Sequence, residues 1–159
     1  MSKWCIKTQD PDQTEQLGVA IGGLLKGGEV IELVSDLGGG KTTLTKGFAK
    51  GIGSTDLVSS PTFTISNVYK GTKLTLHHYD FYRLGEMGLM SEELAETLED
   101  PEVVSVIEWA EEAHDMLPTG RLIRIEVSLV AADENYRDII IEMADVHDER
   151  FKTLGLKPC

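Results

Sequence analysis

A glycine-rich stretch at residues 38–42, Gly-Gly-Gly-Lys-Thr, constrains the fold of this chain more than any other feature. It follows an apolar segment at residues 29–35 that predicts a strand. It precedes a segment at residues 41–52 whose apolar residues recur every four positions and predict a helix. In that setting successive backbone N–H groups and the positive end of the helix point at a phosphate. The sequence therefore predicts a phosphate-binding loop.

The expected nucleotide-binding residues of this loop are Leu37, Gly38, Gly39, Gly40, Lys41, Thr42 and Thr43. In a loop of the form G-x-x-x-x-G-K-[ST], the lysine reaches the β- and γ-phosphates and the next hydroxyl binds Mg²⁺, which assigns these tasks to Lys41 and Thr42. The first position of the pattern holds Ser35 instead of glycine. A side chain there can clash, because the chain turns sharply away from the strand. The alternative interpretation is a glycine-rich turn that binds nothing.

The remaining elements alternate between strands and helices. Further strands are predicted at residues 4–9, 62–71, 73–80, 103–109, 121–130 and 136–144, and further helices at 10–25, 91–98 and 148–156. We expect Asp10 and Ser91 to cap their helices and the chain to turn at Gly71. The prediction is a single domain over residues 1–159 with an α/β fold, a P-loop NTPase-like three-layer sandwich. Its mixed sheet has parallel core strands and an antiparallel C-terminal portion.

Charge and composition limit the classes of function. Acidic residues outnumber basic ones, 27 to 15, and the formal net charge is -12. This balance opposes direct binding of nucleic acid, which requires clustered lysine and arginine, but it permits a protein partner that holds nucleic acid. No run approaches the roughly 18 apolar residues of a membrane span, and the N-terminus lacks the pattern of a signal peptide. Cys5 and Cys159 are too few for a disulfide framework, so a cytoplasmic protein is expected.

Two carboxylates follow predicted strands and compete for the role of the acidic residue that serves the metal. Glu108 ends an apolar run that starts at residue 103, and it should emerge at the carboxyl edge of a buried strand, where ligands bind in α/β folds. Asp80 follows an alternating segment that predicts a less buried strand. The residues alone therefore favour Glu108. His77 and His78 are adjacent, so their side chains face opposite sides of a strand and predict no zinc site.

Four segments resemble, in order and approximate spacing, a bacterial ATPase family of tRNA threonylcarbamoyladenosine biosynthesis, the TsaE or YjeE family. They are residues 36–44, 59–69, 77–84 and 107–111, and the similarity extends from about Gln13 to Arg137. The family's loop usually reads G-D-L-G-A-G-K-T-T, so Ser35 and Gly39 both depart from it. We expect the glycine to be harmless and the serine to affect nucleotide affinity. The resemblance implies a protein that uses ATP and Mg²⁺.

The resemblance also implies roles for residues outside the loop. We expect Glu108 in the metal shell and Asp80 orienting a water molecule, the exchanged roles being the alternative. With Lys41, these are the predicted catalytic residues. Thr62, presented by an extended residue before Pro61, adds a hydroxyl for the metal or the γ-phosphate. The predicted metal ligands are thus Thr42, Thr62, Asp80 and Glu108, and the further nucleotide contacts are Thr14, Arg83, Trp109 and Arg137. For these four the alternatives are a helix start, core packing or a surface position.

Two functions compete. The resemblance implies an ATPase that hydrolyses slowly alone and supports a TsaB–TsaD-type protein complex. That complex makes N6-threonylcarbamoyladenosine at position 37 of tRNA, so this chain would meet tRNA only through its partners. The alternative is a small-molecule kinase acting on nucleosides or nucleotides, but the chain shows no arginine-rich lid segment before its last strands. A binding module with a degenerate loop is a third possibility, which rests on Ser35. The sequence leaves self-association and the partner surface open.

Overall fold

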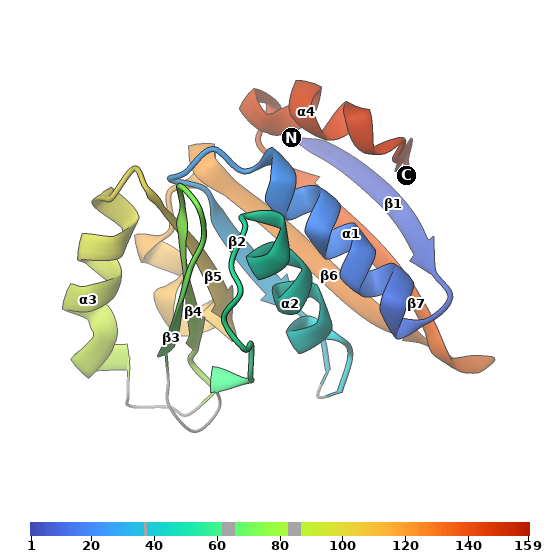
Figure 1. The fold of residues 1–159 in the computed structure, drawn as a ribbon, viewed down its shortest axis with the longest axis horizontal. Helices are drawn as coiled ribbons and strands as arrows, with labels where there is room; N and C mark the ends of the chain where they lie inside the picture. The colour runs from blue at the N-terminus through green and yellow to red at the C-terminus, as the bar shows by residue number, and fades with distance from the viewer. Residues whose placement is uncertain (37, 62–65, 83–86) are drawn as a thin grey trace.

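The computed structural model describes residues 1–36, 38–61, 66–82 and 87–159. They form an eight-stranded sheet in the order β3-β4-β5-β2-β6-β7-β1-β8, with helices on both faces (Figure 1). The strands are β1 (Ser2–Thr8), β2 (Val30–Val34), β3 (Ser66–Lys70), β4 (Thr75–Asp80), β5 (Val103–Glu108), β6 (Leu122–Val130), β7 (Asp133–Met143) and β8 (Lys157–Pro158). The helices are α1 (Pro11–Leu24), α2 (Lys41–Gly51), α3 (Met87–Glu99) and α4 (Asp145–Phe151), with short 3-10 turns at Ala110–Met116, Thr119–Arg121 and Lys152–Leu154.

The strand pairing confirms the predicted mixed sheet. Strands β4, β5, β2 and β6 run parallel to one another, whereas β3–β4, β6–β7, β7–β1 and β1–β8 are antiparallel pairs. The hairpin predicted at Gly71 is present, since its N–H donates to the carbonyl of Leu74 at 2.8 Å. The central strand β2 leads into the glycine loop, so the loop emerges at the carboxyl edge of the parallel strands, as expected of a ligand site.

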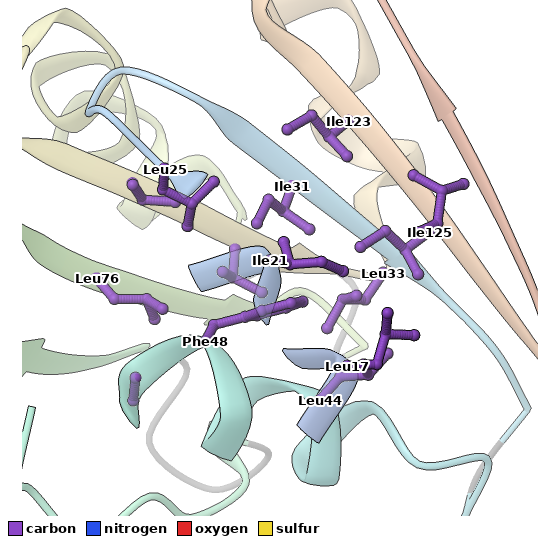
Figure 2. Close-up of a cluster of buried hydrophobic side chains, with 14 of the residues drawn as sticks. Leu17, Ile21, Leu25, Ile31, Leu33, Leu44, Phe48, Leu76, Ile123 and Ile125 are labelled. Carbon is purple, nitrogen blue, oxygen red and sulfur yellow. The ribbon is translucent and has the colours of Figure 1, made fainter. Parts of the chain in front are cut away.

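Helices α1 and α2 cover one face of the sheet and enclose its larger core. Figure 2 shows Leu17 and Ile21 of α1 and Phe48 of α2 among the sheet residues Ile31 and Ile125. On the other face, α3 and the turn Ala110–Met116 enclose a second cluster over β4, β5 and β2. The two clusters give the predicted three layers. Because β5 is buried on both faces, it carries the nearly continuous apolar run that the sequence shows.

Glycines set an unusually close contact between α1 and α2. A Cβ on Gly18 would lie 2.5 Å from the carbonyl oxygen of Leu44, and one on Gly22 would lie 2.6 Å from that of Phe48. Across the contact, Gly47 and Gly51 of α2 meet the α1 backbone in the same way. Side chains as small as alanine would push the helices apart. This contact fixes α2, and therefore the loop at its N-terminus, against the rest of the molecule.

The start of α1 is as predicted, but the start of α3 is not. Asp10 caps α1, its carboxylate accepting from the backbone N–H of Gln13 at 2.8 Å. The prediction that Ser91 caps its helix is wrong, because α3 begins at Met87 and Ser91 lies inside it. Met90 packs against the same cluster as Leu94, so the apolar stripe continues one turn further back than the serine suggests.

The two cysteines are joined, which the sequence analysis missed. Cys5 of β1 forms a disulfide with Cys159, although 154 positions separate them. Pairing of β8 with β1 brings the chain end to this place, and spacing in the sequence carries no sign of that pairing. The cysteines are still too few for a framework, but they do form one structural bond. Within the described residues, no helix is long and apolar enough to cross a membrane.

Candidate nucleotide-binding site

A hollow of about 440 Å³ lies over the glycine loop and the ends of β4 and β5. It is lined by residues Gly38, Gly39, Gly40, Lys41, Thr42, Thr43, Ser60, Asp80, Tyr82, Glu108 and Trp109. Two larger hollows, of about 520 and 730 Å³, lie elsewhere: one at the ends of α1 and α2, the other beside the C-terminal segment. Neither combines backbone N–H groups at a helix start with carboxylates. The hollow over the loop is therefore the candidate site.

The loop has the backbone of a phosphate-binding nest. Gly38 and Gly40 have φ values of 77° and 107°, a left-handed conformation that favours glycine. Gly40 is the N-cap of α2, and as a glycine it supplies no side-chain cap to the first N–H groups of that helix. These N–H groups and the helix dipole suit an anion. The Nζ atom of Lys41 donates to the carbonyl of Ser35 at 3.0 Å, so the cation is held inside the loop.

Ser35 and Gly39 share one space. Trp109 is the only described non-glycine residue with a positive φ, so Ser35 needs no glycine-like backbone. A Cβ on Gly39 would lie 1.6 Å from the Oγ of Ser35 and 2.9 Å from its Cβ. The serine side chain therefore occupies the volume that an alanine methyl at position 39 would need. The serine at position 35 and an alanine at position 39 would therefore compete for the same volume in this loop.

Asp80 and Glu108 stand side by side. They are register partners on the adjacent parallel strands β4 and β5. Their residues are only 5% and 3% exposed, and both line the hollow. The prediction that β4 is the less buried of the two strands is confirmed, since two of its residues are only partly buried whereas all of β5 is buried. Its last three residues are nevertheless buried, because β3 pairs outside β4 and α3 covers it. Asp80 also accepts from the backbone N–H of Tyr82 at 2.9 Å, which orients its carboxylate.

Trp109 lies at the hollow and outside both core clusters. Its φ of 56° is left-handed, a strained conformation for a bulky residue and one that concentrates at functional sites. The indole packs on Tyr82 with ring centroids 5.0 Å apart. The Nζ of Lys41 is 5.1 Å from the indole centroid. The tryptophan thus lies beside the loop lysine, and its contact with a nucleotide stays a prediction.

Arg137 contacts the glycine loop from outside the hollow. Its Nε donates to the carbonyl of Gly39 at 2.9 Å, although the residue does not line the hollow. Thr14 also lies outside the lining: its buried hydroxyl is 2.7 Å from that of Thr8, a register partner of Arg137. In this structure Thr14 is hydrogen-bonded to Thr8 and does not reach the hollow, whereas Arg137 holds the backbone of the glycine loop. The predicted site residues Leu37, Thr62 and Arg83 lie outside the described residues.

His78 is a site neighbour that the sequence analysis missed. Its Nε2 is 3.0 Å from Oε1 of Glu108, and its side chain is fully buried. The analysis considered the pair of histidines only as metal ligands. The usable signal was the two-residue spacing from His78 to Asp80, which puts both side chains on one face of β4.

The loop, the parallel strand order and the site at their carboxyl edge define the class: the chain has a P-loop NTPase-like fold. It belongs to the TsaE family, since the family model described as "Threonylcarbamoyl adenosine biosynthesis protein TsaE" matches residues 8–139. The fold is also that of the crystal structure of YdiB from Bacillus subtilis, with a TM-score of 0.77 and 29% identity over 98% of this chain and 96% of that one.

Curated relatives agree with this assignment. The "tRNA threonylcarbamoyladenosine biosynthesis protein TsaE" of Bacillus subtilis (strain 168) is 38% identical over 138 residues, which are 86% of this chain and 82% of the relative. The protein of the same name from Nostoc sp. is 38% identical over 131 residues, 80% of this chain and 78% of the relative. The family's role in tRNA threonylcarbamoyladenosine biosynthesis is thereby the context for this chain.

Proposed function

We propose that this chain is a Mg²⁺-dependent ATPase that supports a protein complex making N6-threonylcarbamoyladenosine in tRNA. The observation that carries the proposal is the meeting of two features at one hollow. One is a glycine loop at the start of α2, and the other is the buried pair of Asp80 and Glu108. Phosphate binding uses the first feature, and control of a metal and a water molecule uses the second.

The loop binds the phosphates of ATP. The N–H groups at the start of α2 and those of the glycines surround the anionic oxygens. Lys41 exchanges its contact with the Ser35 carbonyl for the β- and γ-phosphates, which is a small movement of a flexible side chain. Trp109 lies beside the lysine and closes one side of the site against water.

The residues present fit Mg²⁺. Thr42, Asp80 and Glu108 supply the oxygen donors that this ion prefers, and two adjacent carboxylates repel each other unless a cation separates them. Among the described residues, no group of three His, Cys, Asp or Glu side chains forms a metal cage. Magnesium fits this arrangement because it is usually held by one or two carboxylates together with substrate phosphates. Bound there, it neutralises charge on the phosphates.

The division of work between the carboxylates follows their contacts. Glu108 is held by His78 and serves the metal shell, whereas Asp80 is oriented by a backbone N–H and positions the attacking water. Thr62 remains proposed as a second hydroxyl at the γ-phosphate. In such sites the protein contributes mainly positioning and charge stabilisation. Slow hydrolysis by the isolated chain, accelerated by a partner that completes the site, is the expected behaviour.

The partner is a TsaB–TsaD-type complex, and tRNA is met only through it. The net charge of -12 opposes a direct grip on a polyanion, while it suits docking on a basic protein surface. We place this work in the cytoplasm, where tRNA is modified.

Phosphate release measured with and without the partner pair tests this function. We expect slow release by the chain alone, faster release with the pair and tRNA, and no transfer to a panel of nucleosides and nucleoside monophosphates. Efficient phosphorylation of any acceptor would replace the proposal with a kinase.

A further inference from the structure

We propose that His78 is a positioning residue that holds the Glu108 carboxylate in its working orientation, an inference that rests on the ATPase function proposed above. His78 does not line the hollow, so it has no direct role in binding a nucleotide. It is nevertheless the side chain that contacts Glu108 most directly.

The topology brings the two side chains together. Strands β4 and β5 are parallel, and the register pairs His78 with Val106 and Asp80 with Glu108. Side chains two apart on a strand share a face, so His78, Asp80 and Glu108 all point to the side of the sheet covered by α2. The imidazole of His78 thus lies on the same face as the two carboxylates, two residues before Asp80 along β4 and deeper in the protein.

Burial makes this contact consequential. The side chains of His78 and Glu108 are 0% and 4% exposed, and Nε2 lies 3.0 Å from Oε1. The imidazole is closed to water, and a buried carboxylate left without its donor is costly. One carboxylate oxygen is committed to the imidazole. The other, Oε2, is then presented in a fixed orientation for the chemistry at the site.

The second ring nitrogen indicates which atom carries the proton. Nδ1 of His78 is buried and has no hydrogen-bond partner among the described residues. A buried N–H without an acceptor is rarer in proteins than an unused lone pair. The arrangement that leaves no such N–H has the ring hydrogen on Nε2, from which it is donated to Oε1 of Glu108. His78 therefore acts as a fixed donor.

The neighbouring His77 is a natural control. It lies on the opposite face of β4, half-buried, with Tyr79 as its aromatic neighbour, and its side chain forms no hydrogen bond or ion pair with Glu108 within the described part of the chain. Burial lowers the pKa of His77, so this ring is neutral at physiological pH. His77 therefore shares the strand and the ring type with His78, but it lacks the contact with Glu108.

Two nearly isosteric variants separate positioning from packing. Both His78→Gln and His78→Met lose the ring, but the glutamine amide nitrogen keeps a donor at the place of Nε2 and methionine has none. We expect His78→Met to lower kcat about 10- to 100-fold, the usual cost of losing a residue that orients a metal ligand, with little change in the affinity for ATP without metal. His78→Gln should recover most of the loss, and His77→Gln should behave as wild type. Equal effects of Gln and Met at position 78 would overturn the proposal, as would unchanged turnover in both.

A spectroscopic measurement on the nucleotide-free protein needs no turnover. The ¹⁵N shifts of the imidazole should show His78 as the Nε2–H tautomer, and Glu108→Ala should alter them while leaving His77 unchanged. An Nδ1–H tautomer, or no response to Glu108→Ala, would overturn the contact. If the wild type with its partner pair hydrolyses no ATP, the ATPase proposal fails, and this measurement still decides the His78–Glu108 contact.

Discussion

At the scale of single residues, Ser35 and Gly39 show how a loop keeps its shape while its sequence departs from the usual pattern. The serine side chain lies where an alanine methyl at position 39 would lie. A serine at the first loop position is therefore compatible with a glycine, but not with an alanine, four positions later. The sequence analysis treated Ser35 and Gly39 as independent and missed this contact. A single sequence does not show which positions contact each other in the folded loop.

This contact predicts non-additive mutations. Gly39→Ala alone should weaken ATP binding or destabilise the loop, because overpacking costs about 1–3 kcal/mol. Ser35→Gly combined with Gly39→Ala should restore binding close to that of wild type. Calorimetric titration of ATP into the two single variants and the double variant measures the coupling. Additive effects, or a harmless Gly39→Ala, would show that the two residues do not share this space.

The other site residues differ in how far the sequence alone predicts their positions. Lys41, Thr42 and Glu108 follow from a loop pattern and from the rule that strand ends meet at one edge of a sheet. The residues alone did not place Asp80 near Glu108, because that depends on the strand order; the resemblance implied only that both carboxylates lie near the metal. The left-handed backbone of Trp109 has no sequence signal, since nothing in a tryptophan predicts a positive φ.

At the scale of elements, the helix pair α1–α2 determines where the loop lies. Glycines recur at a spacing of four in both helices, at 18 and 22 and at 47 and 51, and the backbones approach across them. The pattern is visible in the sequence, but glycine inside a helix is also read as a weakness or an end signal. Only packing shows which of the helical glycines are contacts.

Adjacent glycines in α1 give a matched test. A Cβ on Gly22 would meet the Phe48 carbonyl at 2.6 Å, whereas one on Gly23 has nothing within 4 Å. Gly22→Ala should therefore lower the free energy of unfolding by about 1–3 kcal/mol. Gly23→Ala should raise it by up to about 1 kcal/mol, because alanine restricts the unfolded chain and favours helix. Urea unfolding followed by circular dichroism measures both. Equal destabilisation by the two substitutions would contradict the close contact.

A buried ion pair ties α4 to the start of β2. Arg150 lies 2.9 Å from Glu29, and the same guanidinium donates to the carbonyl of Leu24 at 2.7 Å. Burial opposes ionisation of Glu29, but the hydrogen bonds from Arg150 and from the backbone N–H groups of Lys26 and Gly27 outweigh it and lower the pKa of this carboxyl. A carboxyl with a lowered pKa in the folded state stabilises the protein above its ordinary pKa and loses that contribution as pH falls.

The pH dependence of stability follows from this pair and its neighbour His147. Burial, reinforced by Arg150, lowers the pKa of His147, so protonation of this ring also favours the unfolded state as pH falls. The free energy of unfolding should therefore decrease from pH 7 towards pH 4. Glu29→Gln should be destabilised at pH 7 and lose less than wild type on acidification. Urea unfolding at the two pH values measures this difference, and parallel losses in the two proteins would contradict the role of the pair.

At the scale of the whole molecule, a disulfide links the first strand to the last residue of the chain. The Cys5–Cys159 disulfide joins residues 154 positions apart, whereas β8 adds only two residue pairs to the sheet. Linking such distant residues restricts the unfolded chain, a stabilisation of about 2–5 kcal/mol. Neither cysteine lines the nucleotide hollow. Reduction should therefore change stability and leave ATP binding unchanged.

Thermal unfolding with and without reductant tests the bond. The wild type should melt at a lower temperature after reduction, and Cys159→Ser should melt at that lower temperature under both conditions. In a reducing compartment the bond is expected to open, so the reduced protein is the form that the cytoplasmic role proposed above would use. A melting temperature of the wild type that does not respond to reductant would contradict the structural disulfide.

The fold as a whole was largely predictable because hydrophobic period, glycine position and the alternation of strands with helices agree with one another. The parallel core follows from alternating strands and helices, and the antiparallel portion follows from two successive strands near the C-terminus. Start and end positions were less predictable, as Ser91 shows. The disulfide was not predictable, because it depends on a two-residue strand that the last residues form only in the folded chain.

The most direct test of the central claim, a working nucleotide site at the glycine loop, is titration of ATP with Mg²⁺ into the wild type and into Lys41→Ala, following heat. The lysine contacts loop carbonyls and contributes little to the core, so both proteins should unfold at similar temperatures. We predict saturable binding to the wild type and none to the variant. Equal binding by both proteins, or no binding to a folded wild type, would contradict the account.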